Sequence, residues 1–191
     1  MPGYELWGAE ERKELQDVLD NGILMRYGFD GPRKGIWKSR ELEKEISETF
    51  GCQFAQLVSS GTAALTTALS ALGIGYGDEV IMPAFTFVAS FEAVISVGAI
   101  PVLVDVDDTL TLSPEAVQKA ITGKTKCIMP VHMCGSMADM DALQEICKQH
   151  KLLLLEDACQ SIGGTYKGKK LGTIGDAGTF SFDFVKTMTC G

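Results

Sequence analysis

The chain has 191 residues, of which 46% are hydrophobic, and its 17 basic and 25 acidic residues give a net charge of −8. This composition predicts one sizeable globular core, and an acidic chain without a basic stripe argues against nucleic acid as a partner and favours a small-molecule substrate. The N-terminus is unlike a signal peptide and no apolar run is long enough to cross a bilayer, so we expect a soluble cytoplasmic protein with no membrane partner. The six cysteines contain no CxxC pair, so we expect no metal site.

The first 52 residues are predicted to form an N-terminal helical segment. Residues 9–20 have a helical pattern, and residues 39–50 form a second helix. Leu42, Ile46 and Phe50 share one face of the second helix, which predicts that this face packs inward.

From residue 53 onward, short apolar runs alternate with helical patterns. Strands are predicted at residues 54–58, 79–82, 101–104, 127–131, 152–155 and 177–182. Helices are predicted at residues 62–72, 87–97, 138–150 and from Pro114 to near Gly123. Because each strand–helix–strand crossover implies parallel pairing, residues 53–191 are predicted to form an α/β domain with a mostly parallel sheet flanked by helices.

Two glycine-rich stretches look like nucleotide-binding loops but are predicted to be turns. Residues 163–170 almost spell a P-loop, yet Lys170 stands where Ser or Thr would hold magnesium, and no helical run follows. Residues 166–172 are predicted to form a polar hairpin instead. A dinucleotide-binding fingerprint follows a strand, whereas residues 73–77 precede one, so these residues are also predicted to form a turn.

Three short motifs carry chemistry. Ser60-Gly61-Thr62 follows a predicted strand and opens a helix, where free N–H groups attract an anion, although a simple N-cap has the same pattern. Asp157 follows a buried-type strand, where ligands of open α/β sheets bind, or else caps a helix. Lys186 lies among apolar and small residues, although most lysines are solvated surface groups. A phosphate cradle, an acid and a lysine together indicate pyridoxal 5'-phosphate (PLP), whose phosphate is anchored, whose ring nitrogen is kept protonated and whose aldehyde forms a Schiff base.

The order of these motifs resembles a known family. The resemblance is carried by Ser-Ser-Gly-Thr-Ala-Ala-Leu at 59–65, Gly-Asp-Glu-Val-Ile at 77–81, Pro-Ala-Phe-Thr-Phe at 83–87, Val-His-Met-Cys-Gly at 131–135, Glu-Asp-Ala-Cys-Gln at 156–160 and Phe-Ser-Phe at 180–182 with Lys186. Together they resemble the DegT/StrS-type sugar aminotransferases, PLP enzymes of the aspartate aminotransferase fold (fold type I). The resemblance implies the large PLP-binding domain of that fold. It also leads us to expect that the chain is truncated, without the small C-terminal domain.

The resemblance implies a role for each site residue. Gly61, Thr62 and Ser181 would hold the phosphate, Phe87 would stack on the ring, Asp157 would pair with the ring nitrogen, Gln160 would contact the ring hydroxyl, and Lys186 would bind the aldehyde and act as the catalytic base. For Phe87 a place in the core stays open. For His132 contact with substrate and a purely structural role both stay open.

The resemblance also implies an activity. An amino group would pass from L-glutamate to a keto or aldehyde sugar, and the enzyme would be a homodimer whose active site is shared between subunits. Lys186 favours transamination over dehydration, because the dehydratases of the family carry histidine at this position. Residues 26–30, 131–137 and 184–191 are similar to a branch that converts 8-oxo-3,8-dideoxy-octulosonate to its 8-amino derivative for lipopolysaccharide. The alternatives are another nucleotide-sugar aminotransferase of the family and a non-catalytic truncated fragment. We expect the 191-residue chain to be an N-terminal portion that is inactive by itself.

Overall fold

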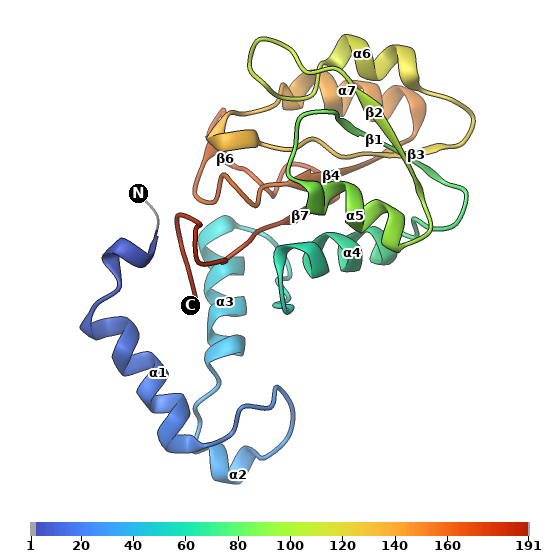
Figure 1. The fold of residues 1–191 in the computed structure, drawn as a ribbon. Helices are drawn as coiled ribbons and strands as arrows, with labels where there is room; N and C mark the ends of the chain where they lie inside the picture. The colour runs from blue at the N-terminus through green and yellow to red at the C-terminus, as the bar shows by residue number, and fades with distance from the viewer. Residues whose placement is uncertain (1–2, 191) are drawn as a thin grey trace.

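A computed structural model describes residues 3–190 (Figure 1). The N-terminal part contains η1 (Gly3–Leu6), α1 (Ala9–Asn21), α2 (Asp30–Arg33) and α3 (Lys38–Phe50). The later helices are α4 (Gly61–Ala71), α5 (Val88–Ser96), α6 (Pro114–Ala120), η2 (Met133–Gly135) and α7 (Met140–His150). The strands are β1 (Glu79–Pro83), β2 (Ile100–Val104), β3 (Thr125–Ile128), β4 (Leu153–Asp157), β5 (Thr165–Tyr166), β6 (Lys169–Lys170) and β7 (Ala177–Thr179).

The centre of the fold is a five-stranded sheet with the order β2-β1-β3-β4-β7. Every neighbouring pair is parallel, which confirms the predicted α/β class. The register pairs Asp157, the last residue of β4, with Thr179, the last residue of β7. The carboxyl ends of these two strands therefore meet at one edge, where open α/β sheets bind ligands.

Helices cover both faces of the sheet. Figure 1 shows α6 and α7 on one face and α4 and α5 on the other. Successive residues of a strand point to opposite faces, and β1 follows this rule: Ile81 joins the apolar cluster under α6 and α7, whereas Val80 and Met82 join the cluster under α4 and α5. Burial on both faces explains why these strands are continuous apolar runs.

Most predicted elements are found within one or two residues of their expected bounds, but the strand at residues 54–58 is wrong. This segment has no ladder partner within the described chain, and Phe54 is 81% exposed. The backbone of Leu57 is bound by side chains instead, because its N–H donates to Glu43 Oε1 (2.7 Å) and its carbonyl accepts from Arg26 (3.4 Å).

Two other predicted strands end early. The strand expected at residues 127–131 stops at Ile128, and Pro130, which lacks an N–H, follows. The strand expected at residues 177–182 stops at Thr179, because its partner β4 ends at Asp157. The hairpin expected at residues 166–172 is confirmed as β5 and β6, so the stretch that almost spells a P-loop is a turn.

The N-terminal helices lie to one side of the sheet, and η1 lies close to the segment around Lys186 (Figure 1). The N–H of Gly3 donates to the carbonyl of Lys186 (2.7 Å), and the rings of Tyr4 and Phe184 stack with centroids 4.5 Å apart. The division between residues 52 and 53 stays a prediction. Across residues 3–190, no helix has both the length and the apolar character that crossing a membrane requires.

Candidate functional site

One cavity of about 1330 Å³ lies where α4 begins and where β4 and β7 end. It is lined by Gly61, Thr62, Phe87, Asp157, Gln160, Ser181 and Lys186, which are all the site residues predicted from the sequence. These residues come from segments far apart in the chain, and the parallel sheet brings them together because it collects strand ends at one edge.

The start of α4 provides an anion site. Ser60 is the N-cap, and its hydroxyl accepts from the N–H of Ala63 (3.0 Å). The next two N–H groups, those of Gly61 and Thr62, have no hydrogen-bond partner within residues 3–190. Because the helix dipole adds positive potential at this end, the geometry fits a phosphate group.

Gly61 is required by crowding rather than by its backbone angles. A Cβ at this position would lie 3.0 Å from Ser181 Cβ and 3.2 Å from both Ser181 Oγ and Cys159 Sγ. The missing side chain lets Ser181 approach the first turn of α4, so that a hydroxyl joins the unpaired N–H groups.

We expect Gly61→Ala to weaken PLP binding by roughly tenfold or more, since the new methyl group displaces Ser181 from the phosphate cradle. The dissociation constant can be measured by absorbance titration. Gly123→Ala is the matched control, because a Cβ there meets no atom within 4 Å. Equal affinities for the two variants would contradict the cradle.

Asp157 presents a buried carboxylate, 3% exposed, at the base of the cavity. Ser90 in α5 donates its hydroxyl hydrogen to Asp157 Oδ2 (2.7 Å), and the Cys159 N–H donates to Oδ1 (3.1 Å). Ser90 therefore accepts from Thr86 Oγ1, which lies 2.8 Å away. These contacts fix the orientation of the carboxylate, and its negative charge fits the protonated nitrogen of a pyridine ring.

Lys186 and Phe87 lie near each other in the cavity. The ammonium of Lys186 is 5.8 Å from the centre of the Phe87 ring, and the ring is 60% exposed. This exposure argues against the alternative that Phe87 belongs to the core. The backbone of Lys186 is held on both sides, since its N–H donates to Asp183 (2.9 Å) and its carbonyl accepts from Gly3 (2.7 Å).

Gln160 is oriented by its carbonyl oxygen. Oε1 accepts from the N–H of Cys134 (3.0 Å), so the amide NH₂ group of Gln160 is left to donate to a ligand oxygen. This polarity suits contact with a ring hydroxylate.

Glu156 is a fully buried carboxylate near the site that accepts four hydrogen bonds, and no role is predicted for it from the sequence. It accepts from His132 Nε2 (3.1 Å) and from the N–H groups of Gly172 (2.9 Å), Ile174 (2.6 Å) and Gly175 (2.8 Å). Burial raises the pKa of Glu156, but the hydrogen bonds from His132 and from the three N–H groups outweigh it and hold the pKa below its usual value.

His132 has a structural role here. It is fully buried, and its Nδ1 accepts from the N–H of Ala138 (3.3 Å), so the hydrogen of the neutral ring lies on Nε2 and is donated to Glu156. Of the two readings left open by the sequence, the geometry favours the structural one. Together, His132 and Glu156 tie the loop at residues 172–175 to β4.

Glu156→Gln should destabilise the fold by about 3 kcal/mol at pH 7, because the new NH₂ group faces N–H donors. The folded-state pKa of Glu156 is lowered, so its stabilisation is present above the unfolded value of about 4.3 and is lost as pH falls through the folded value. Urea unfolding at pH 7 and at decreasing pH should therefore show the gap to wild type shrinking in acid. Exposed Glu145→Gln is the control, and a gap independent of pH would contradict this account.

The residues missed by sequence reasoning are those that support the site. Ser90 and Glu156 act through partners distant in the chain, and Thr86 acts through Ser90, so no motif at the site marks them. The only available signal was a polar Ser90 on the buried face of the helix that starts after Phe87.

The chain is similar to known proteins in both sequence and fold. Residues 6–191 match the DegT/DnrJ/EryC1/StrS aminotransferase family. The crystal structure of 3-amino-5-hydroxybenzoic acid synthase is 43% identical with a TM-score of 0.88, and the match covers 96% of this chain and 46% of that one. An aminotransferase from Psychrobacter cryohalolentis is 37% identical with a TM-score of 0.87, over 96% of this chain and 45% of that one.

A third similar structure contains the cofactor. The E. coli GDP-4-keto-6-deoxy-D-mannose-3-dehydratase with bound hydrated PLP is 30% identical with a TM-score of 0.85, over 96% of this chain and 46% of that one. The present chain spans about half the length of these solved structures. The likeness confirms the aminotransferase fold predicted from the sequence.

Proposed function

Because the chain belongs to the DegT/DnrJ/EryC1/StrS aminotransferase family, we propose that it binds PLP and transfers an amino group from L-glutamate to a keto or aldehyde sugar. The observation that carries the proposal is that one cavity is lined by every residue expected to bind the cofactor. The unpaired N–H groups at the start of α4, the buried carboxylate and the lysine match the phosphate, ring nitrogen and aldehyde of PLP in chemistry.

The residues of the chain divide the work. Gly61, Thr62 and Ser181 bind the phosphate, and Asp157 pairs with the ring nitrogen. Phe87 covers one face of the ring, and Gln160 donates to the ring oxygen. When bound, PLP supplies an aldehyde that takes up and releases amino groups and a ring that withdraws electrons. Lys186 would hold the aldehyde, and its Nζ would take the proton from the donor α-carbon as a general base.

The proposed acceptor is 8-oxo-3,8-dideoxy-octulosonate, whose amination gives an amino sugar of lipopolysaccharide. The support is the sequence of residues 26–30, 131–137 and 184–191, which is similar to the branch that uses this sugar. The alternative is the keto sugar of a nucleotide sugar, a class to which the substrate named for the E. coli dehydratase belongs. Lys186 favours amino transfer over dehydration, because a lysine both binds the cofactor and moves the proton.

We also propose a homodimer that shares its active sites. Large apolar side chains near the cavity are exposed in the single chain, including Phe54, Phe87, Phe184, Val185 and Met188. A second subunit would cover such a surface. Sedimentation of the purified chain with PLP measures this directly.

Transfer of isotope from ¹⁵N-labelled L-glutamate tests the function. The full-length protein, loaded with PLP, is incubated with the 8-oxo sugar or with a nucleotide keto sugar, and the products are analysed by mass spectrometry. We expect ¹⁵N in the octulosonate product. If ¹⁵N appears only in the nucleotide sugar, the acceptor is a nucleotide sugar and not the octulosonate. If PLP binds at Lys186 but no 2-oxoglutarate forms, the non-catalytic alternative is favoured.

A further inference from the structure

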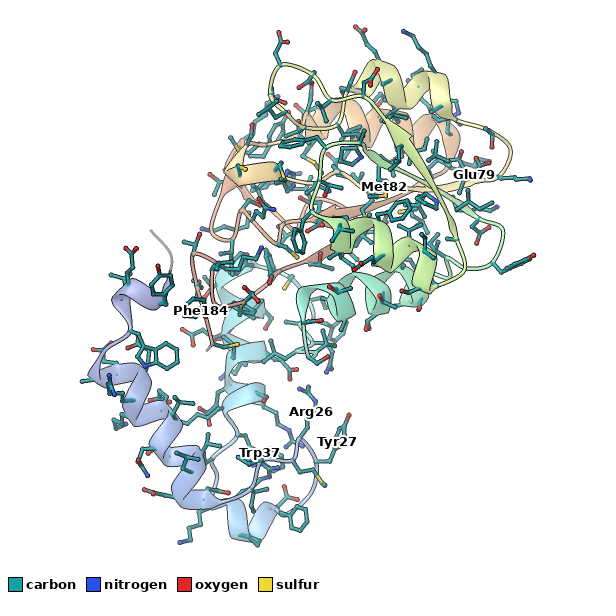
Figure 2. The ribbon with its side chains drawn as sticks, viewed as in Figure 1. Arg26, Tyr27, Trp37, Glu79, Met82 and Phe184 are labelled. Carbon is teal, nitrogen blue, oxygen red and sulfur yellow. The ribbon has the colours of Figure 1, made fainter. Side chains whose placement is uncertain are left out.

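A second cavity, of about 190 Å³, lies among α1, α2, α3 and the loop at residues 22–29. It shares no lining residue with the cavity at Lys186. Four cationic side chains line it, those of Arg26, Arg33, Lys38 and Arg40, and within the described chain no carboxylate does. Figure 2 labels Arg26, Tyr27 and Trp37 in this part of the molecule. In a protein with a net charge of −8, this cavity concentrates positive charge.

The four cations differ in their partners. Arg26 pairs with Glu43, and Lys38 pairs with Glu14 and with Asp17. Neither Arg33 nor Arg40 forms an ion pair anywhere in residues 3–190. Two of the four positive charges are therefore left without a counter-ion.

Arg33 is the more unusual of these two because it is only 5% exposed. Its Nε donates to the carbonyl of Gly28 (2.8 Å), and its Nη2 donates to the carbonyl of Met25. The guanidinium carbons of Arg33 and Arg40 lie 4.1 and 3.6 Å from the centre of the same Trp37 ring. Carbonyl groups and a π face orient the buried guanidinium of Arg33 but do not neutralise it, whereas Arg40, which contacts the same ring, is exposed to solvent. A bound anion would supply the charge that Arg33 lacks.

Asn21 adds a polar acceptor to the same cavity. Its Nδ2 donates to the carbonyl of Arg33 (2.8 Å), which fixes the amide. Its Oδ1 is buried and has no hydrogen-bond partner, the one such side-chain atom in the described chain. A buried acceptor of this kind requires a donor, which a ligand hydroxyl or a water supplies.

We propose that this cavity binds the acidic end of a small hydroxylated acid, a sugar carboxylate or a sugar phosphate. Arg33 and Arg40 contact the oxyanion, and Asn21 Oδ1 accepts from a neighbouring hydroxyl group of the ligand. The cavity has the volume of about six liquid waters, enough for the anion and the adjoining carbons. The inference does not depend on the function proposed for the Lys186 cavity.

Fluorescence of Trp37 tests the proposal. The chain has two tryptophans, so Trp7→Phe leaves Trp37 as the only one. The probes are inorganic phosphate, D-gluconate and glucose 6-phosphate. We expect a saturable change with at least one probe, weakened roughly tenfold by Arg40→Gln and by Arg33→Lys, which loses the planar fork. Arg12→Gln, which removes the same charge from exposed α1, should change the affinity less than about twofold.

The outcomes separate the two sources of the anion. Tighter binding of gluconate supports a sugar carboxylate, and tighter binding of glucose 6-phosphate supports a sugar phosphate. No saturable response to any probe at millimolar concentration, or an equal loss in Arg12→Gln, would overturn the proposal. Cofactor attachment at Lys186 should be unchanged in Arg40→Gln, so failure here and failure of the proposed function are distinguishable.

Discussion

Replacing Lys186 with alanine is expected to remove the covalent adduct that borohydride reduction forms between PLP and the chain. The same substitution is expected to lower the rate of amino transfer by at least about a thousandfold. The ammonium of Lys186 lies in the cavity, 5.8 Å from the Phe87 ring centre, among the residues that match the cofactor. In the proposed function one nitrogen both binds the aldehyde and moves the proton, so a single substitution would remove two functions. The adduct is mapped by mass spectrometry after digestion.

Non-covalent binding of PLP should survive in Lys186→Ala, because the phosphate and ring contacts come from other residues. Lys186→Arg keeps the charge but cannot form the adduct, and it should resemble the alanine variant in rate. Lys169→Ala removes an exposed lysine of the β5–β6 hairpin and should keep the full adduct. An adduct that persists in Lys186→Ala would assign the attachment to another lysine and contradict the proposed site.

The sequence was sufficient for the layers of the fold but not for every strand. Apolar runs such as that of β4 are recognisable because a strand covered on both faces excludes polar residues. The segment at residues 54–58 has the composition of a strand, yet a strand also needs a neighbour with unpaired backbone groups. Here Glu43 and Arg26 bind the Leu57 backbone instead, and no local pattern reveals that.

The site residues likewise fall into those that the sequence identifies and those that only the fold reveals. Gly61, Asp157 and Lys186 were identifiable because each belongs to a short motif at a strand end or helix start. The crowding that makes Gly61 necessary involves Ser181 and Cys159, far along the chain, and appears only in the fold. Likewise, Ser90 donates to a carboxylate 67 residues away. Sequence motifs therefore indicated which groups line the cavity, whereas the groups that hold them in place required the structure.

Asp157→Asn is expected to lower the rate of amino transfer by roughly a hundredfold to several thousandfold, the range that loss of one partner of a buried charge pair implies. The carboxylate is buried, and Ser90 and the Cys159 N–H fix both of its oxygens. Burial raises the pKa of the adjacent Cys159 thiol, and so does the charge of Asp157, which leaves the thiol neutral beside the carboxylate. In the proposed site, the negative charge facing the cofactor ring would therefore come from Asp157. Its loss should act mainly on turnover, because the phosphate site keeps binding PLP.

Ser90→Ala separates the charge of Asp157 from its orientation. The serine hydroxyl donates to Oδ2 while accepting from Thr86, so its removal leaves the charge in place but frees the carboxylate to rotate. We expect a loss of roughly tenfold in rate, the size of one hydrogen bond to a charged group. Exposed Asp141→Asn removes the same charge outside the cavity and should have little effect.

A rate for Asp157→Asn within about threefold of wild type would show that the ring nitrogen does not depend on this carboxylate, because so small a change corresponds to less than one hydrogen bond.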